Sequence, residues 1–355
     1  MKSYIALPAA IALSCSKSLI FRGVSASKPN RRGFWFVNTV SFAVATLALA
    51  AIAACGGGLF ENGRLKLSLA TFLLAVPFAL CTLGAQIFYI AAQGRGSVSL
   101  NTFLYSCGFI VPVAYGVAAL HEAVKITQIA GLIVLIGAMY LYLLPKKGRF
   151  DKLWLALISA ASLLSGAVGI LQKVQQNSAQ HAEADGFLIV TFALCAAISC
   201  ALAIVFKPAG EVAPASTGND ETLCETAAGE VVVQKNTAKA ARQIAAVGVS
   251  VKEAWLAVAS GAVAAALNRV NLSLAGALPS MIFYPVFNGT VTLATGVAAF
   301  LISKEKLDLR QWLSLLLGIA AIVTVICIVA AYPAAWAIAK VVKPKNRNLL
   351  MMVVI

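Results

Sequence analysis

Gly116-Val117-Ala118-Ala119-Leu120 and Gly296-Val297-Ala298-Ala299-Phe300 are nearly the same five residues, and they begin 180 positions apart. The likeness extends to both sides of this stretch. Downstream, Glu122 and Gln128 recur as Glu305 and Gln311, each 183 positions later. Upstream, Gln86 and Tyr89 correspond to Asn268 and Asn271, each 182 positions later. The sequence therefore predicts that the chain contains an internal repeat.

The composition is that of a membrane protein. Of 355 residues, 61% are hydrophobic and 12% are charged, whereas a soluble domain has roughly half its residues apolar and about a quarter charged. This excludes an ordinary soluble protein, a disordered chain and a disulfide scaffold. The net charge of +15 would indicate a nucleic-acid partner in a soluble protein. Here we attribute it to basic loops retained on the cytoplasmic side, and no nucleic-acid partner is expected.

Ten apolar runs are long enough to cross a bilayer, whose core of about 30 Å requires roughly 20 helical residues. They are 4–21, 34–54, 69–92, 99–120, 126–144, 153–171, 187–206, 254–277, 280–303 and 312–331. Because a backbone in hydrocarbon must satisfy its own hydrogen bonds, each run is predicted to be a helix.

The repeat and the runs together predict the topology. Each half holds five helices in the same order, and because five is odd, the second half enters the membrane from the opposite side. We therefore predict an all-α integral membrane protein with two inverted five-helix repeats. The predicted boundaries are 1–145 for the first repeat and 151–332 for the second, which includes a polar, flexible loop at 207–252. Residues 333–355 are predicted to form an interfacial tail.

Nearly the whole chain, apart from the 207–252 loop and the tail, resembles a known family, and the first-half segment around Glu122 does so less closely than several stretches of the second half. The stretches are Asn268–Ser280, Phe283–Gly289, Lys304-Glu305-Lys306-Leu307 with Gln311, and Gly318-Ile319-Ala320-Ala321. They are similar to EamA-type members of the drug/metabolite transporter superfamily. The resemblance implies a ten-helix inverted-repeat transporter of the plasma (inner) membrane, with a central cavity lined by helices of both bundles. The 207–252 loop is not part of the family's usual pattern.

Three ionisable residues lie within or at the edge of the runs, namely Lys17, Lys173 and Arg269, while all 13 acidic residues fall in loops, termini or helix ends. Ionisable residues in a membrane are costly and indicate function. A carrier of lipophilic cations would be expected to hold a membrane carboxylate, and the small multidrug members of the superfamily carry a glutamate in their first helix. An anionic or zwitterionic substrate is therefore the preferred prediction.

The candidate substrate-binding residues are these cations and the polar side chains in the runs. They are Arg269, Asn268, Asn271, Lys17, Lys173, Gln86, Tyr89 and Asn288. For Arg269 and the asparagines, the alternative is a structural hydrogen-bond cluster between helices. For the two lysines, the alternative is that the ammonium groups reach the headgroups. Glu122 and Glu305, at helix ends, are interpreted as interfacial ion-pairing or capping residues.

No enzyme site is predicted. His121 and His181 are the only histidines, neither begins a metal-binding motif, and no phosphate-binding glycine loop is present, so no catalytic residue, metal or cofactor is expected. The predicted function is secondary transport of a small metabolite by alternating access, with the substrate and the lipid bilayer as partners and a homodimer left open. The alternative is a non-transporting scaffold or sensor subunit that binds a partner through the 207–252 loop.

Overall fold

The computed structural model describes residues 2–27, 31–55, 60–61, 64–65, 67–122, 151–205 and 250–303, together with positions 129, 133–134, 137, 312–313 and 316–317. The predicted loop at 207–252 and the tail at 333–355 therefore lie outside the described residues, apart from 250–252 at the end of the loop. Most of the predicted runs 126–144 and 312–331 lie outside them too, as do Glu305 and Gln311.

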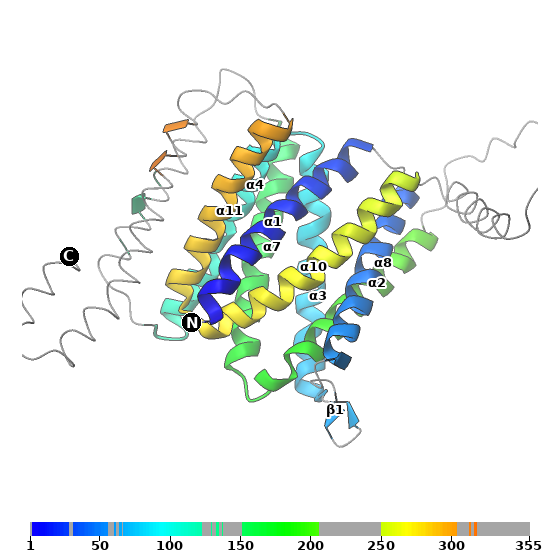
Figure 1. Cartoon of the computed structure of the whole chain (residues 1–355), viewed down its shortest axis with the longest axis vertical. Helices are drawn as coiled ribbons and strands as arrows, with labels where there is room; N and C mark the ends of the chain where they lie inside the picture. Colours follow the sequence, from blue (N-terminus) through cyan, green and yellow to red (C-terminus); the bar gives the residue numbers. More distant parts are fainter. Residues whose placement is uncertain are drawn as a thin grey trace, which may run out of the picture. The chain divides into compact units, whose positions relative to one another are not determined.

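The described chain is helical (Figure 1). The long helices are α1 (Lys2–Ser27), α2 (Arg31–Cys55), α3 (Leu69–Gln93), α7 (Lys152–Asn177), α8 (Ala184–Val205), α10 (Val251–Ala277) and α11 (Ser280–Ser303). The shorter elements are α4 (Val98–Ser106), the 3-10 turn η1 (Cys107–Phe109), α5 (Ile110–Ala118), the 3-10 turn η2 (His181–Glu183), and the two-residue strands β1 (Phe60–Glu61) and β2 (Arg64–Leu65). The helices overlap the predicted runs wherever the structure describes them, but the predicted run 99–120 is divided into α4 and α5 by the 3-10 turn η1.

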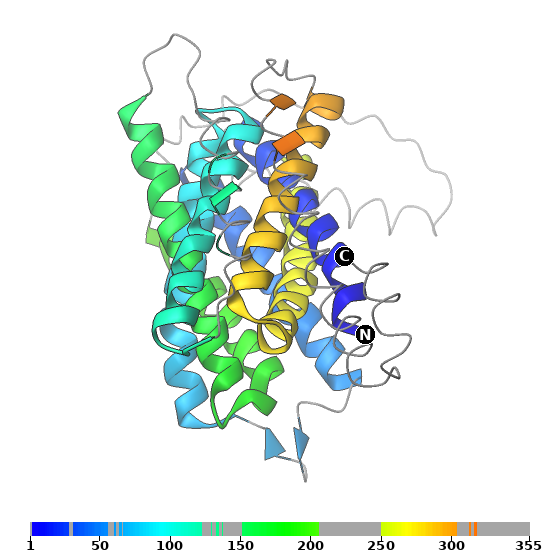
Figure 2. The same ribbon diagram turned by 90° about the vertical axis from the view of Figure 1, so that its left-hand side faces the viewer.

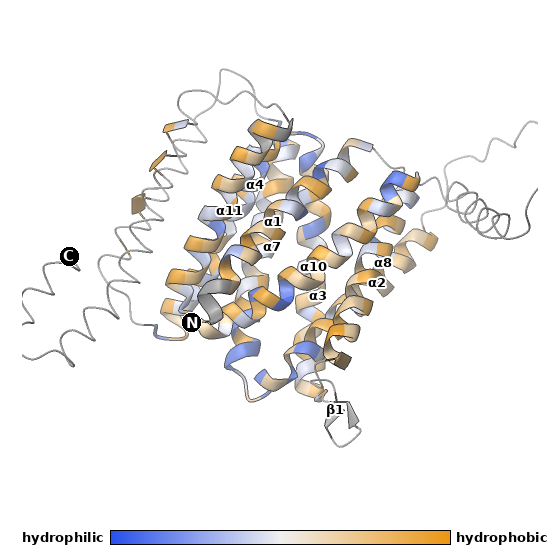
Figure 3. Cartoon of the chain, viewed as in Figure 1, coloured by the Kyte–Doolittle hydropathy of each residue, from blue (hydrophilic) through white to orange (hydrophobic). Residues whose placement is uncertain are grey.

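Seven spans among the described residues are long and apolar enough to cross a membrane. They are Ala6–Ser27, Arg32–Cys55, Leu69–Gln93, Val98–Ala118, Lys152–Asn177, His181–Val205 and Ser280–Ala298. Apolar residues predominate along these helices in Figure 3. Large apolar side chains such as Leu47, Leu69 and Ile204 are exposed, which is unfavourable in water but neutral against lipid. These features indicate that the protein is embedded in a membrane.

Helix α10 is not among the seven spans, although its sequence was predicted to cross the membrane. Its 27 residues include Lys252 and Glu253 in the first turn and the polar group Asn268-Arg269 farther along. Its start is capped by a reciprocal pair of hydrogen bonds. The Ser250 amide donates to Glu253 Oε2 at 2.7 Å, and the Glu253 amide donates to Ser250 Oγ at 3.2 Å. This is the capping box, in which the two side chains satisfy backbone donors left free by a helix start.

The chain divides into two compact units, and each takes segments from both halves of the sequence. Among the described residues, unit 1 takes its members from Met1–Ser18, Cys81–His181 and Leu267–Ile355, and unit 2 takes its members from Leu19–Leu80 and Ala182–Ala266. In unit 2, α2 packs along α8 (Figure 1). Phe42 stacks on Phe192 with ring centroids 5.9 Å apart, and Phe78 meets Phe187 edge-on at 4.8 Å. Offset and edge-to-face arrangements of this kind are the favourable ones for aromatic rings.

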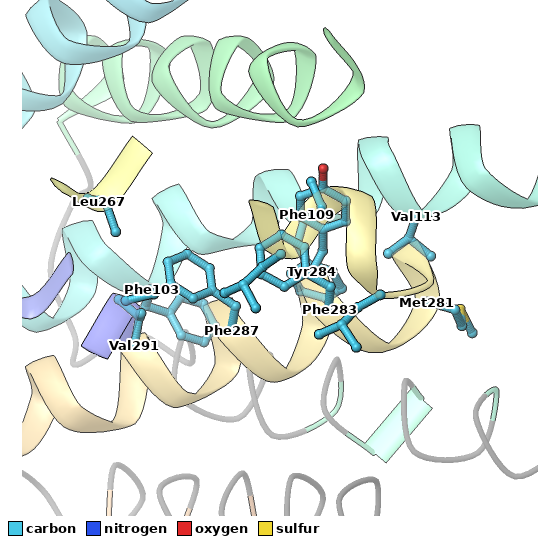
Figure 4. Close-up of a cluster of buried hydrophobic side chains, with 13 residues drawn as sticks. Phe103, Phe109, Val113, Leu267, Met281, Phe283, Tyr284, Phe287 and Val291 are labelled. Atoms are coloured by element: carbon cyan, nitrogen blue, oxygen red, sulfur yellow. The ribbon is translucent and has the colours of Figure 1, made fainter. Parts of the chain in front are cut away.

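In unit 1, α11 packs against α4 and α5, and both of these pack against α7; Figure 2 shows α11 beside α4 and α5. The apolar core between them contains Phe103 and Phe109 from the α4–η1 segment and Phe283 and Phe287 from α11 (Figure 4). Close approach of α7 depends on Gly108, because a β-carbon there would lie 2.2 Å from the Ser162 carbonyl oxygen. Small residues that let helix backbones approach are typical of packing within membranes.

Candidate functional site

All eight candidate residues predicted from the sequence lie in unit 1. They come from five helices: Lys17 from α1, Gln86 and Tyr89 from α3, Lys173 from α7, Asn268, Arg269 and Asn271 from α10, and Asn288 from α11. Four of them are buried, namely Gln86, Tyr89, Lys173 and Asn268, and the others are half-buried. Residues far apart in the sequence thus contribute polar groups to the interior of one compact unit.

Tyr89 lies at the centre of a small group of hydroxyls. Its phenol oxygen lies 2.9 Å from Thr102 Oγ1 of α4, and it donates to Ser18 Oγ of α1 at 3.3 Å. Its ring is tilted against that of Tyr105, with centroids 4.6 Å apart. Ser18 directly follows Lys17 in the sequence. The phenol therefore links α3 to α4 and to the segment of α1 that carries a predicted cation.

Lys173 is the candidate whose environment is defined most completely. Its ammonium donates to the backbone carbonyl oxygen of Leu278 at 2.7 Å and to Glu122 Oε1 at 3.2 Å. The side chain is only 5% exposed. An ammonium group this deeply buried does not extend toward the headgroups. The alternative given for the lysines, in which the ammonium reaches the headgroups, therefore does not describe Lys173 in this structure. Its charge is compensated by protein groups.

Glu122 is the acidic partner in this arrangement. Its Oε2 atom accepts a hydrogen bond from the Ser280 amide at 2.6 Å, and its Oε1 atom accepts one from the Ser280 hydroxyl at 3.1 Å. The sequence predicted ion pairing or capping for Glu122, and the structure shows both. The partner, Lys173, is 51 residues away. Along the sequence, Glu122 has His121 as its ionisable neighbour, and no local pattern indicates Lys173 as its partner.

The turn after α5 brings the Glu122 carboxylate to this position. His121 has a φ of 50°, in the left-handed region that non-glycine residues seldom adopt. Gly116, the first residue of the repeated stretch, provides the space: a β-carbon there would lie 2.6 Å from Ser280 Cβ and 3.0 Å from Glu122 Oε2. Gly116, in the first copy of the repeated stretch, thus has a packing role at the start of α11.

The remaining candidates differ in how their polar atoms are used. Asn288 donates to the Tyr284 carbonyl oxygen of its own helix at 2.9 Å. Asn271 has a buried Oδ1 atom with no hydrogen-bond partner among the described residues. Arg269 is half-buried, and both it and Asn268 take part in polar interactions. Asn271 therefore has acceptor capacity that the described protein does not use, whereas the Asn288 amide donates within its own helix.

Across the residues that the structure describes, no group of three His, Cys, Asp or Glu side chains is placed to hold a metal ion.

No protein-family model matches the chain, and no curated protein matches it. One solved structure that resembles the chain is described only as "Crystal structure of protein". It is 12% identical in sequence and superposes with a TM-score of 0.58, and the match covers 92% of this chain and 97% of the other. At this level of identity, the likeness concerns the fold alone.

Proposed function

We propose that the protein is a secondary transporter that moves a small anionic or zwitterionic metabolite across the membrane by alternating access between two inverted five-helix repeats. The observation that supports this most is the concentration of buried polar side chains in the helices of unit 1. Lys173, Gln86, Tyr89 and Asn268 are each less than 9% exposed. Burial of so many polar groups in a membrane protein is costly and is typical of a substrate pathway.

The residue types favour an anionic group on the substrate. Arg269 presents a planar fork of donors that matches a carboxylate or a phosphate. Asn271 offers an amide whose Oδ1 atom has no partner in the described residues, so it is suited to receive a donor such as a substrate ammonium. A ligand that carries both a carboxylate and an amine could bind to Arg269 through the first group and to Asn271 through the second. In this proposal the inverted repeat supplies the symmetry for alternating access, as it does in many secondary transporters.

Flux measurements with the purified full chain in liposomes test the proposal. The probes are radiolabelled amino acids, dicarboxylates and sugar phosphates, with a neutral sugar and tetraphenylphosphonium as the contrasting uncharged and cationic solutes. We expect flux of at least one anionic or zwitterionic probe, reduced at least tenfold by Arg269→Ala.

Lys252→Ala is the matched control, because Lys252 lies on the same helix but is exposed in its first turn. It should leave flux unchanged. Flux that is the same for Arg269→Ala and the unsubstituted protein would contradict the assignment of Arg269. Flux confined to tetraphenylphosphonium would contradict the proposed substrate class.

A further inference from the structure

Three positions near the end of α7 contact the end of α10, the turn that follows it and the start of α11. The Tyr284 hydroxyl donates to the Gly169 carbonyl oxygen at 2.7 Å, and Lys173 donates to the Leu278 carbonyl oxygen at the same distance. A β-carbon on Gly276 would lie 3.3 Å from Gln176 Cγ. Residues 169, 173 and 176 follow the spacing that places side chains on one helix face. The end of α7 therefore contacts residues on both sides of the α10–α11 turn and Leu278 within it.

Lys173 and Glu122 each lie at the helix end whose partial charge is opposite to their own. The Lys173 ammonium contacts Leu278, directly after the C-terminus of α10, where backbone carbonyl groups lack partners. The Glu122 carboxylate accepts the Ser280 amide at the N-terminus of α11. Cations are favoured at helix C-termini and anions at N-termini. Lys173 thus compensates the partial negative charge at the C-terminus of α10, and Glu122 compensates the partial positive charge at the N-terminus of α11. The two side chains also compensate each other's charge.

The opposite end of α7 is held to a different hairpin. The Trp154 indole donates to Asn101 Oδ1 at 2.7 Å, and Arg95 forms an ion pair with Asp151 at 3.0 Å. Trp154 and Lys173 are 19 residues apart, or about 28 Å along a helix. That separation is close to the thickness of a bilayer core. The α3–α4 hairpin therefore contacts the start of α7 and the α10–α11 turn contacts its end, at positions that would lie near opposite membrane surfaces.

The ion pairs at the two ends of α7 differ in their exposure to solvent, although the Trp154–Asn101 hydrogen bond is buried. Arg95 and Asp151 have side chains 46% and 49% exposed, whereas Lys173 and Glu122 are 5% and 16% exposed. An exposed ion pair contributes little and is exchanged easily for water. A buried pair resists separation, because each charge left alone is poorly solvated.

We propose that Lys173, Glu122, the Ser280 amide and the Leu278 carbonyl form a gate that keeps the α10–α11 turn closed on α7 at one membrane surface. This inference rests on the proposed transport function and identifies the residues that would close the substrate pathway at one membrane surface. The gate depends on which residue carries which charge, as well as on the attraction between the two charges. The cation has to lie at the C-terminus of α10 and the anion at the N-terminus of α11. Opening exposes Leu278, which is buried against the apolar core of unit 1.

Labelling of a single cysteine tests the gate without a substrate. The eight native cysteines are replaced by alanine in the full chain, and Leu278→Cys is introduced, which keeps the backbone carbonyl that Lys173 contacts. The measurement is the rate of reaction with a polar maleimide in detergent, on protein that is monodisperse by gel filtration. Glu122→Gln should accelerate labelling about tenfold or more, the size expected when a hydrogen bond loses its charge.

Two further variants sharpen the test. Glu183→Gln is the matched control. Like Glu122, Glu183 accepts hydrogen bonds from a backbone amide and a hydroxyl, here those of Ser68 just before α3, but it lies in the other unit. It should leave the labelling rate unchanged. The double variant Glu122→Lys with Lys173→Glu restores the opposite charges but reverses their direction. It should label as fast as Glu122→Gln, because each charge then meets the wrong helix end.

A reversible cross-link gives an independent readout. In the cysteine-free chain, Gln176→Cys with Gly276→Cys places a sulfur near the present Gln176 Cγ, 3.3 Å from the new β-carbon, and the corresponding separation in a disulfide is about 3 Å. Oxidation should stop flux of whichever probe is transported, and reduction should restore that flux.

The outcomes separate this inference from the proposed function. Labelling that is unaffected by Glu122→Gln, or flux that continues through the cross-linked protein, would overturn the gate even if transport is demonstrated. Slow labelling of the charge-reversed double variant would overturn the role of charge direction. Accelerated labelling in a protein that moves none of the probes would support the gate and count against transport.

Discussion

The indole nitrogen of Trp154, at the start of α7, donates a 2.7 Å hydrogen bond to Oδ1 of Asn101 in α4. Asn101 in turn donates to the Ala92 carbonyl oxygen at 3.2 Å and to Gln93 Oε1 at 3.4 Å. Both Trp154 and Asn101 are buried. One asparagine side chain therefore holds the end of α3, the start of α4 and the start of α7 in a fixed relation.

Trp154→Phe should destabilise the protein by about 1–3 kcal/mol, because the buried Asn101 oxygen would lose its donor. The measurement is chemical or thermal unfolding in detergent, followed by tryptophan fluorescence. Trp255→Phe is the control, since Trp255 is 70% exposed, and it should change stability by less than about 0.5 kcal/mol. Equal effects of the two substitutions would show that the hydrogen bond contributes nothing to stability.

Gly108→Ala should cost about 1–3 kcal/mol, the usual range for overpacking, because the added carbon would overlap the Ser162 carbonyl oxygen of α7. Gly23→Ala offers a comparison: its added carbon would lie 3.2 Å from the end of the flexible Leu256 side chain. It should be nearly neutral, since the better helix propensity of alanine offsets a small shift. Unfolding midpoints of the two variants check the difference. A stable Gly108→Ala protein would contradict the close approach.

Glu183→Ala should loosen the first turn of α3. The Glu183 carboxylate accepts hydrogen bonds from the Ser68 amide at 2.8 Å, from the Ser68 hydroxyl at 3.0 Å and from the Thr71 hydroxyl. Loss of a cap costs about 0.5–2 kcal/mol. Amide hydrogen exchange of residues 69–73 should accelerate, while exchange of the first turn of α4, which has its own cap at Ser97, should not. Unchanged exchange at both sites would show that the carboxylate does not stabilise α3.

Acidification should remove the contribution of Asp151 to stability. The hydrogen bond from Arg95, followed by that from the Leu153 amide, lowers the pKa of Asp151 below its ordinary value of 3.8. A lowered pKa means that the folded state favours the carboxylate, so the stabilisation is present above pH 3.8 and is lost as the pH falls through the folded-state value.

The difference in unfolding midpoint between the unsubstituted protein and Asp151→Asn measures this effect. It should be constant from pH 7 to pH 5 and should shrink below pH 3.8. When both proteins also carry Arg95→Ala, the difference in unfolding midpoint should be smaller at every pH above 3.8. A difference that grows as the pH falls would contradict the direction of the pKa change.

Most of the helices of the described residues could be predicted from the amino-acid sequence, whereas the short strands β1 and β2 and the 3-10 turn between α4 and α5 could not. Apolar runs such as 34–54 and 187–206 became helices because a backbone in hydrocarbon has to satisfy its own hydrogen bonds, and that requirement is local. The candidate residues were also identified from local signals, because a lysine or an asparagine within an apolar run stands out. The inverted ten-helix repeat stays a prediction, since most of the fifth and tenth runs lie outside the described residues.

The partners of those residues could be found only from the three-dimensional packing. Lys173 meets Glu122, 51 positions away, and Leu278, 105 positions away, and Trp154 meets Asn101 of another helix. Spacing along one helix shows which face a side chain occupies but not which helix packs against that face. Packing depends on close approach at residues such as Gly108 and Gly116, so it is a property of several distant segments at once. The charge of Lys173 was evident from the sequence, whereas its compensation by Glu122 required the fold.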